Sequence, residues 1–405
     1  MLKRYFLNNK KRNFSTASIW IKGGSDMDST GKKGINKILC SLLTRGCEGF
    51  NNFTLSEYVE SYGAELNQEI FEDGISISVK SLNEHFSKLF PLLELIINKP
   101  ILSETEFKKV KKSSIDHIKK DKENPFNICF EKWRKIVYSN HPYAFNTIGN
   151  ANDVSKITYE DVLLEFKNFK NREKYLISNN PEINGENFGT LEKKILKEKS
   201  DPLNHNLNTT NRFDYINNDS NQTIIMMGDQ TCSRRSSEYF PLKVLESYLS
   251  YGMSAALFKL FREKHGITYD LGVYYPIRSG NAPFLIYLSV SNDQALFAFE
   301  LLSTLWKNLL LNTLTDAEIF LAKEKLKGSF LLGNQSLDEI LQRKIQLVSY
   351  GISPISENDL NSKIEEISSL DILKLTNKYF SKPFLSISGN KNICLEISNR
   401  WEKNF

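Results

Sequence analysis

The segment Phe284-Leu285-Ile286-Tyr287-Leu288-Ser289-Val290, with the residues after it as far as Leu332, contains the pattern that decides the fold. The apolar run 284–290 predicts a strand. Ala295 to Leu311 carries apolar residues at helical spacing and predicts a helix. Leu314-Thr315-Asp316-Ala317-Glu318 is a capping box that opens a second helix, because the Thr and Glu side chains satisfy each other's backbone amides. The segment therefore reads strand, helix, capped helix.

The same three elements occur in the same order about half a chain earlier: Ile75 to Val79 as the strand, Glu84 to Asn98 as the helix, and Ser103 with Glu106 as the capping box of a lysine-rich helix ending before Asn124-Pro125. Ser103 and Thr315 are 212 residues apart, and Ser78 and Ser289 are 211 apart. One such match could arise by chance, whereas three elements in register indicate a duplication.

The duplication predicts an α+β fold of two duplicated domains, each an antiparallel-rich sheet with helices packed on one face. Between the two copies, residues 179–221 are rich in Asn, Asp, Lys, Gly and Pro and poor in large apolar side chains. We expect an N-terminal domain at residues 1–185, a linker at 186–220 and a C-terminal domain at 221–405.

Composition excludes several protein classes. The chain has 405 residues, of which 40% are hydrophobic and 25% charged, as in ordinary globular proteins. Its formal net charge of +5 is small and spread along the chain, and no aromatic platform accompanies the lysines, so we expect no nucleic-acid partner. The apolar runs are short and interrupted by charge, so we expect no membrane span.

The first residues and the cysteines indicate the compartment. Met1 to Arg12 contains basic residues but no apolar core of a signal peptide, so we expect a cytoplasmic protein. The five cysteines are scattered and form no CxxC pair, which favours reduced, buried thiols.

Chemistry is expected in two further stretches. Ser18 to Lys22 alternates as a strand, and Gly34 to Leu43 reads as a helix after a Gly-rich turn. In the second half, Gly252-Met253-Ser254 precedes a helix, and Phe261 to Tyr269 follows with Arg262 near its start.

On these residues the sequence resembles the pitrilysin/insulinase family of zinc metallopeptidases, the inverzincins, which includes processing peptidases. The resemblance runs from about Ala17 to about Ser353 and is strongest from Gly252 to Tyr269 and from Thr315 to Gly351. Active members carry His-x-x-Glu-His on the helix after the Gly-Ser turn. There, residues i and i+4 of one helix face hold zinc, and the Glu acts as general base.

The resemblance places Lys37, Cys40 and Ser41 where active members have the first His, the Glu and the second His. An ammonium repels a divalent cation, a hydroxyl is a poor zinc ligand, and no carboxylate stands at the base position. The third-ligand position falls at His117, 76 residues beyond Ser41, with Asp116 beside it. The motif is therefore degenerate, and we expect no metal in this chain. Cys40 with His117 could still hold a stray metal ion if both faced one pocket.

The family pattern survives in the second half. Arg262 and Tyr269 match a pair that non-catalytic subunits of the family retain, and the resemblance implies that they reach the substrate at the partner's zinc. Asn67 aligns with a family Asn beside the active cleft. Alternatively, Arg262 pairs with a nearby acid, Tyr269 packs at a strand start, and Asn67 belongs to a structural turn. The chain lacks the long glycine-rich loop of the mitochondrial substrate-binding subunit, so presequence recognition is not implied.

The resemblance implies a peptidase homologue that is inactive alone. It would pair with a zinc-bearing homologous subunit and bind a peptide or unfolded polypeptide through Arg262, Tyr269 and Asn67. The alternatives are a scaffold subunit without a peptidase role, and an active zinc metalloendopeptidase with unconventional ligands.

Overall fold

The computed structural model describes residues 2–7, 13–187, 211–333, 336–352 and 360–405, apart from the side chains of Asn187 and Tyr269. The chain divides into two compact units. The first takes the described residues within 1–120, 145–200 and 333–356, and the second takes those within 121–144, 201–332 and 357–405. Most of the expected linker 186–220 lies outside the described residues.

The first unit contains a six-stranded mixed sheet in the order β3-β4-β2-β5-β1-β6. Its strands are β1 (Leu2–Phe6), β2 (Phe14–Lys22), β3 (Glu65–Ile70), β4 (Gly74–Leu82), β5 (Lys174–Ser178) and β6 (Glu186–Asn187). Its helices are α1 (Ile35–Leu43), α2 (Asn52–Ser61), α3 (Phe86–Asn98), α4 (Glu104–Asp121), α6 (Ala151–Lys156), α7 (Tyr159–Lys170) and α12 (Leu337–Ser349).

The second unit repeats this arrangement with a five-stranded sheet in the order β7-β11-β8-β10-β9. Its strands are β7 (Phe213–Asn217), β8 (Gln222–Gln230), β9 (Thr268–Tyr274), β10 (Pro283–Ser291) and β11 (Phe384–Gly389). Its helices are α5 (Pro125–Tyr138), α9 (Tyr239–Ser250), α10 (Ala295–Leu311), α11 (Asp316–Gly333), α14 (Leu360–Glu365), α15 (Ser369–Tyr379) and α16 (Lys391–Asn404). Taken in reverse, as β9-β10-β8-β11-β7, the second sheet corresponds strand by strand to β3-β4-β2-β5-β1 of the first sheet, so the α+β fold and its duplication are confirmed.

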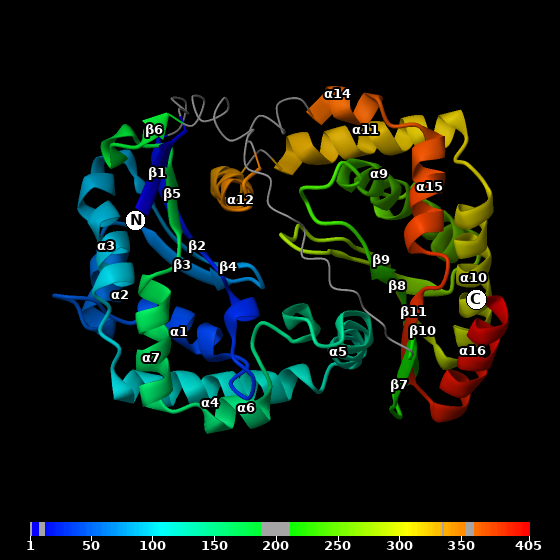
Figure 1. Cartoon of the computed structure of the whole chain (residues 1–405), viewed down its shortest axis with the longest axis horizontal. Coiled ribbons are helices and arrows are strands. Elements are labelled where there is room, and N and C mark those ends of the chain that lie inside the picture. The colour runs from blue at the N-terminus through cyan, green and yellow to red at the C-terminus, as the bar shows by residue number, and fades with distance from the viewer. Residues whose placement is uncertain (1, 8–12, 188–210, 334–335, 353–359) are drawn as a thin grey trace. The chain divides into compact units, whose positions relative to one another are not determined.

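The first sheet is covered on both faces. Along β2, Ile19 and Ile21 belong to the large core under the helices that include α1 and α3, whereas Trp20 belongs to a smaller cluster with Leu341 and Ile345 of α12. Successive side chains of a strand point to opposite faces, so β2 separates two cores. Helix α12, drawn in orange beside β2 in Figure 1, thus adds a cover on the face opposite the main helical layer.

Helix α5 plays the same part in the second unit. It packs on β7, β8 and β11, and Ser386 of β11 donates to the carbonyl oxygen of Cys129 at 3.1 Å. The Tyr138 hydroxyl donates to the carbonyl oxygen of Asn281 at 2.9 Å. Each unit is therefore completed by a helix that the other half of the sequence encodes.

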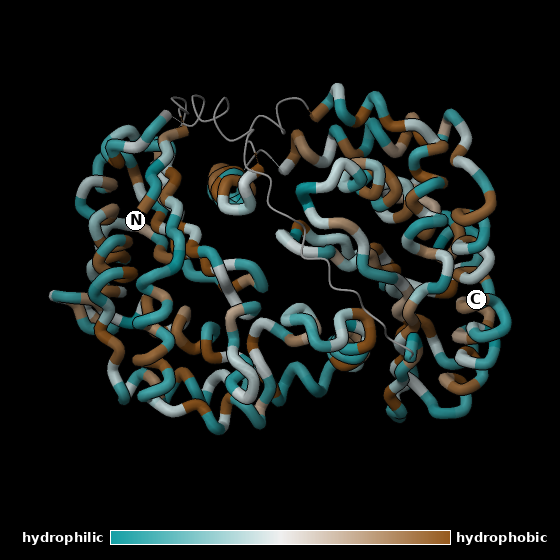
Figure 2. The backbone as a smooth tube through the Cα atoms, in the orientation of Figure 1, coloured by the Kyte–Doolittle hydropathy of each residue, from teal (hydrophilic) through white to brown (hydrophobic). Residues whose placement is uncertain are grey.

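The local signals in the sequence account for most element boundaries. Helix α10 occupies Ala295–Leu311 as predicted, and hydrophobic residues, brown in Figure 2, recur along the helices of both units. Thr315 and Glu318 form both bonds of their capping box. At the earlier box only the bond from the Glu106 amide to Ser103 is made, at 3.5 Å, because the Glu106 carboxylate pairs with Arg45 and Lys109. Among the described residues, no helix combines the length and the apolar character that crossing a membrane requires.

Candidate functional site

Helix α1, which carries the degenerate motif, is anchored at its start by Asp28. The Asp28 carboxylate accepts from the amides of Gly34 at 2.6 Å and Asn36 at 3.0 Å, and from the Asn36 side chain at 2.8 Å. Gly34 has a φ of 101°, and a Cβ there would lie 2.7 Å from the carbonyl oxygen of Ile148, so only glycine fits. The motif therefore stands on a rigidly held helix.

Cys40 lies inside the core of the first unit. It is completely buried, and burial raises the pKa of its thiol to about 12, with Lys37 opposing the shift and Glu69 adding to it. The thiol is thus protonated at neutral pH, and a protonated thiol is neither a general base nor a metal ligand. The residue at the base position of the motif cannot act on a substrate.

The other motif positions do not supply metal ligands either. Lys37 and Ser41 are partly buried on α1, whereas His117 and Asp116 are exposed on α4. Within the ranges that the structure describes, no three His, Cys, Asp or Glu side chains are grouped so that they could hold a metal ion. The residues present at the motif do not fit the zinc ion that the family resemblance implies.

Asn67 occupies β3, the strand at one end of the first sheet, and is exposed. Leu66 and Ile70 pack with the core that contains Cys40. Side chains alternate between the two faces along a strand, so the Asn67 side chain points to the face opposite this core. On that face the Gln342 amide of α12 donates to the carboxylate of Glu69 at 3.3 Å. The structure therefore does not bring Asn67 and Cys40 together.

Arg262 lies in the second unit, in the π-helical segment Phe258–Lys264 that follows the turn at Gly252. It is exposed, and its guanidinium carbon stands 5.1 Å from the centre of the Phe258 ring. The segment closes where the Ile267 amide donates to the carbonyl oxygen of Phe261 at 2.9 Å. Single π-helical turns occur frequently at functional sites.

Tyr269 stands seven residues further on, in β9, at one end of the second sheet. The register of β9 against β10 shifts between Thr268 and Asp270, so the backbone of Tyr269 forms a bulge. Bulges re-aim side chains at the edges of sheets. The Tyr269 side chain itself lies outside what the structure describes.

Sequence reasoning missed a copy of the degenerate motif in the second unit. Helix α9 carries Lys243, Glu246 and Ser247 at the spacing of Lys37, Cys40 and Ser41 on α1. Beyond the end of each helix, a Gly with positive φ stands five residues after the Ser, at Gly46 (136°) and Gly252 (73°). This repeated spacing of Lys, Ser and Gly is the signal that could have revealed it.

The α9 set forms a closed cluster. The Lys243 ammonium lies 2.7 Å from the Glu246 carboxylate and also donates to the carbonyl oxygen of Tyr275. The Tyr251 hydroxyl donates to the same carboxylate, and Ser247 donates to the carbonyl oxygen of Ala322 at 2.8 Å. Burial raises the pKa of Glu246, while Lys243 opposes that shift. All these hydrogen-bond partners belong to the second unit, so the cluster anchors α9 within that unit.

Comparison with known proteins agrees with the fold. Residues 4–151 match the model of the insulinase family, peptidase family M16, and residues 182–326 match the model of the peptidase M16 inactive domain. A solved structure of a peptidase M16 inactive domain from Pseudomonas fluorescens superposes with a TM-score of 0.82 at 18% identity, covering 96% of this chain and 95% of that one.

Two curated proteins are similar over most of the chain. A Rickettsia felis protein named an uncharacterized zinc protease is 23% identical over 370 residues, which are 89% of this chain and 88% of that protein. The mitochondrial-processing peptidase subunit beta of Saccharomyces cerevisiae is 21% identical over 429 aligned positions, covering 96% of this chain and 89% of that protein.

Proposed function

The chain belongs to the insulinase family of peptidases, family M16, and from this premise we propose that it is the non-catalytic subunit of a two-chain peptidase. Its partner is a homologous subunit that holds the zinc ion. The substrate is a peptide or an unfolded polypeptide. In such a pair, this chain has lost the catalytic site and its partner retains it.

The observation that carries the proposal is the chemistry of α1. A family motif that depends on two imidazoles and a carboxylate is replaced by an ammonium, a buried protonated thiol and a hydroxyl. No single substitution restores the site, because the first ligand, the base and the second ligand are all changed. A chain with this helix contributes to proteolysis only through a partner.

Arg262 gives the second unit a role in such a pair. An exposed guanidinium offers fixed donors to a peptide carbonyl or carboxylate, and the adjoining Phe258 ring limits its mobility. Tyr269, in the bulge of β9, would donate its hydroxyl to the same substrate. We expect the peptide substrate to add as a further strand to the edge of a sheet. Strands β3 and β9 are edge strands of their sheets.

The relatives support a paired function. The similar yeast protein is by its name one subunit of a processing peptidase. The Rickettsia relative, which this chain matches over 88% of its length, is by its name a zinc protease. A relative of this kind would be a zinc-bearing partner of the type that the proposal requires.

The test is a mixing assay with metal quantitation. The tagged chain is isolated with the proteins bound to it, each chain is separated, and zinc and peptide cleavage are measured for each chain and for the mixture. We expect zinc on the partner alone and cleavage in the mixture alone. Stoichiometric zinc on this chain, or cleavage by this chain alone, would overturn the proposal.

Variants then test the substrate role. Arg262→Ala should lower kcat/KM of the mixture by at least about tenfold, the effect of removing one charged hydrogen bond. Lys264→Ala is the matched control, since Lys264 is exposed in the same π-helical segment. Equal turnover of Arg262→Ala, Tyr269→Phe and the parent mixture would leave a scaffold subunit as the correct assignment. Cell fractionation tests the cytoplasmic location that belongs to the same proposal.

A further inference from the structure

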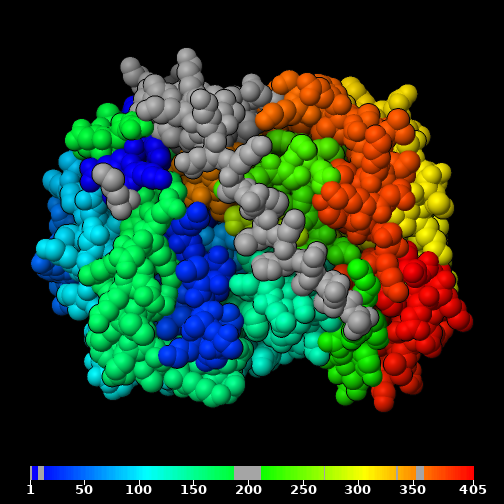
Figure 3. Space-filling model, in the orientation of Figure 1, coloured from blue at the N-terminus to red at the C-terminus, as the bar shows by residue number. Residues whose placement is uncertain are grey.

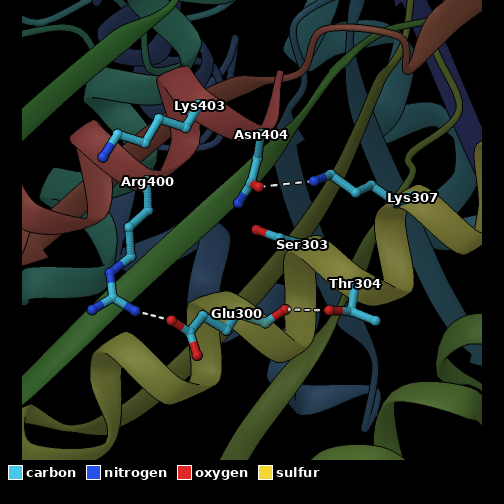
Figure 4. Close-up of a pocket in the computed structure, with 7 residues that line it drawn as sticks. All are labelled: Glu300, Ser303, Thr304, Lys307, Arg400, Lys403 and Asn404. Carbon is cyan, nitrogen blue, oxygen red and sulfur yellow. Dashed lines mark hydrogen bonds and ion pairs between the residues drawn. The ribbon is translucent and has the colours of Figure 1, made fainter.

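A cavity of 460 Å³ lies between α10 and α16 of the second unit (Figure 4). Residues of α16, red in Figure 3, form part of the surface of this unit. The volume lies within the range of pockets that bind small molecules. None of its lining residues belongs to α1, to the π-helical segment or to β9, so the cavity is separate from the site proposed for proteolysis.

The lining carries more positive than negative charge. The lining contains three cationic side chains and a single carboxylate: Lys307, Arg400 and Lys403 are the cations, and Glu300 is the carboxylate. Arg400 is engaged by Glu300 and also by Glu396, the latter at 2.6 Å, so its charge is compensated.

Two ammonium groups remain without an acidic partner. Lys307 donates to the side-chain oxygen of Asn404 at 2.8 Å, which is a neutral acceptor. The Lys403 ammonium makes no hydrogen bond or ion pair with any residue that the structure describes. Two cations in one cavity lining, without carboxylate partners, create a positive potential that a dianion would neutralise.

Ser303 supplies an independent sign of a missing partner. It is only 3% exposed, and its hydroxyl has no hydrogen-bond partner among the described residues. The next residue, Thr304, satisfies its hydroxyl by donating to the carbonyl oxygen of Glu300 at 2.9 Å. A buried hydroxyl left unpaired is energetically unfavourable, because it has lost its hydrogen bonds to water. Figure 4 shows Ser303 between the two helices, on the cavity wall.

We propose that this cavity binds a small phosphorylated molecule, with its phosphoryl group held by Lys307, Lys403 and the Ser303 hydroxyl. A phosphoryl dianion matches two ammonium groups and accepts several hydrogen bonds at once. The cavity is larger than one phosphoryl group, so it also holds an organic part. The Glu300 carboxylate offers that part an acceptor for a hydroxyl group.

Calorimetric titration of the full chain at constant ionic strength tests the proposal. The probes are inorganic phosphate, AMP and glucose 6-phosphate, with adenosine and glucose as their dephosphorylated counterparts. We expect saturable binding of phosphate and of at least one ester, and none of adenosine or glucose. Absence of saturable binding by all three phosphorylated probes up to tens of millimolar would overturn the proposal, as would equal binding of the dephosphorylated molecules.

Variants locate the binding. The double variant Lys307→Gln with Lys403→Gln should weaken phosphate binding more than tenfold, and Ser303→Ala should weaken it less. Lys374→Gln is the matched control, because Lys374 is an exposed lysine of α15 in the same unit. Thermal melts verify that every variant is folded. Unchanged affinity of the folded double variant, or an equal loss in Lys374→Gln, would show that the phosphate binds elsewhere.

Discussion

At the scale of single residues, Cys40 shows how burial decides chemistry. The family resemblance places Cys40 where active members have a catalytic carboxylate, and the core around Cys40 keeps its thiol protonated. The other four cysteines are buried as well, and their pKa values are likewise raised, chiefly by burial.

We predict that the native chain does not react with a thiol reagent at pH 8. Thiolates are the reactive species, and five buried thiols with raised pKa values supply very few of them. The measurement is labelling with Ellman's reagent before and after addition of guanidinium chloride, with all five cysteines reacting only in the denaturant. Rapid reaction of a thiol in the native chain would show that its side chain is accessible.

A second residue-scale prediction concerns Asp26. Burial and, next, the carboxylate of Asp73 raise the pKa of Asp26 to about 7. Between about pH 4 and pH 7, Asp26 therefore carries a proton in the folded state and is mostly ionised in the unfolded state. Because the folded state binds more protons, the free energy of unfolding of the wild type falls as pH rises through that window. Asp26→Asn should raise the free energy of unfolding by about 1 kcal/mol or more at pH 8.

Urea unfolding at pH 8 and pH 4 measures this effect. The gain of Asp26→Asn should shrink to well under 1 kcal/mol at pH 4, where Asp26 is protonated in the folded state and partly protonated in the unfolded state. Asp116→Asn, a change of the same kind at an exposed position, is the control. A gain of equal size at both pH values would contradict the assignment to titration.

At the scale of elements, α5 and α12 are the informative helices. Each covers the sheet face that its unit's own helical layer leaves open, and each comes from the other half of the sequence. Trp133 of α5 is completely buried, and its indole nitrogen has no hydrogen-bond partner within the described part of the chain. Its contribution is therefore one of packing.

Trp133→Ala should lower the free energy of unfolding by about 3–5 kcal/mol, because a large cavity is left under α5. Trp133→Phe keeps an aromatic ring and loses no hydrogen bond within the described structure, so it should cost less than about 2 kcal/mol. Chemical denaturation followed by circular dichroism gives both values. Equal losses in the two variants would mean that packing volume is not what Trp133 contributes.

At the scale of the whole molecule, the exchange of helices makes each half of the sequence incomplete. Residues 1–187 contain α5 without the sheet that it covers, and residues 211–405 contain α12 without the first sheet. An exposed apolar helix and an uncovered sheet face destabilise each half.

We predict that each of these two fragments alone melts at a lower temperature than the intact chain and aggregates, whereas co-expressed fragments purify together. Size-exclusion chromatography and thermal melts of the fragments, singly and together, measure this. A fragment that melts alone at the temperature of the intact chain would contradict the role given to the exchanged helices.

The sequence by itself determined the duplicated strand and helix order and the capped start of α11. Periodicity and caps act through neighbours three or four residues apart, so they can be read locally. Only the tertiary structure decided that Cys40 is buried in the core, that Asn67 lies on the other face of the sheet, that α5 and α12 are exchanged, and that Lys307 and Lys403 line one cavity. These outcomes depend on which distant surfaces pack together, and packing between elements leaves no periodic mark in either one.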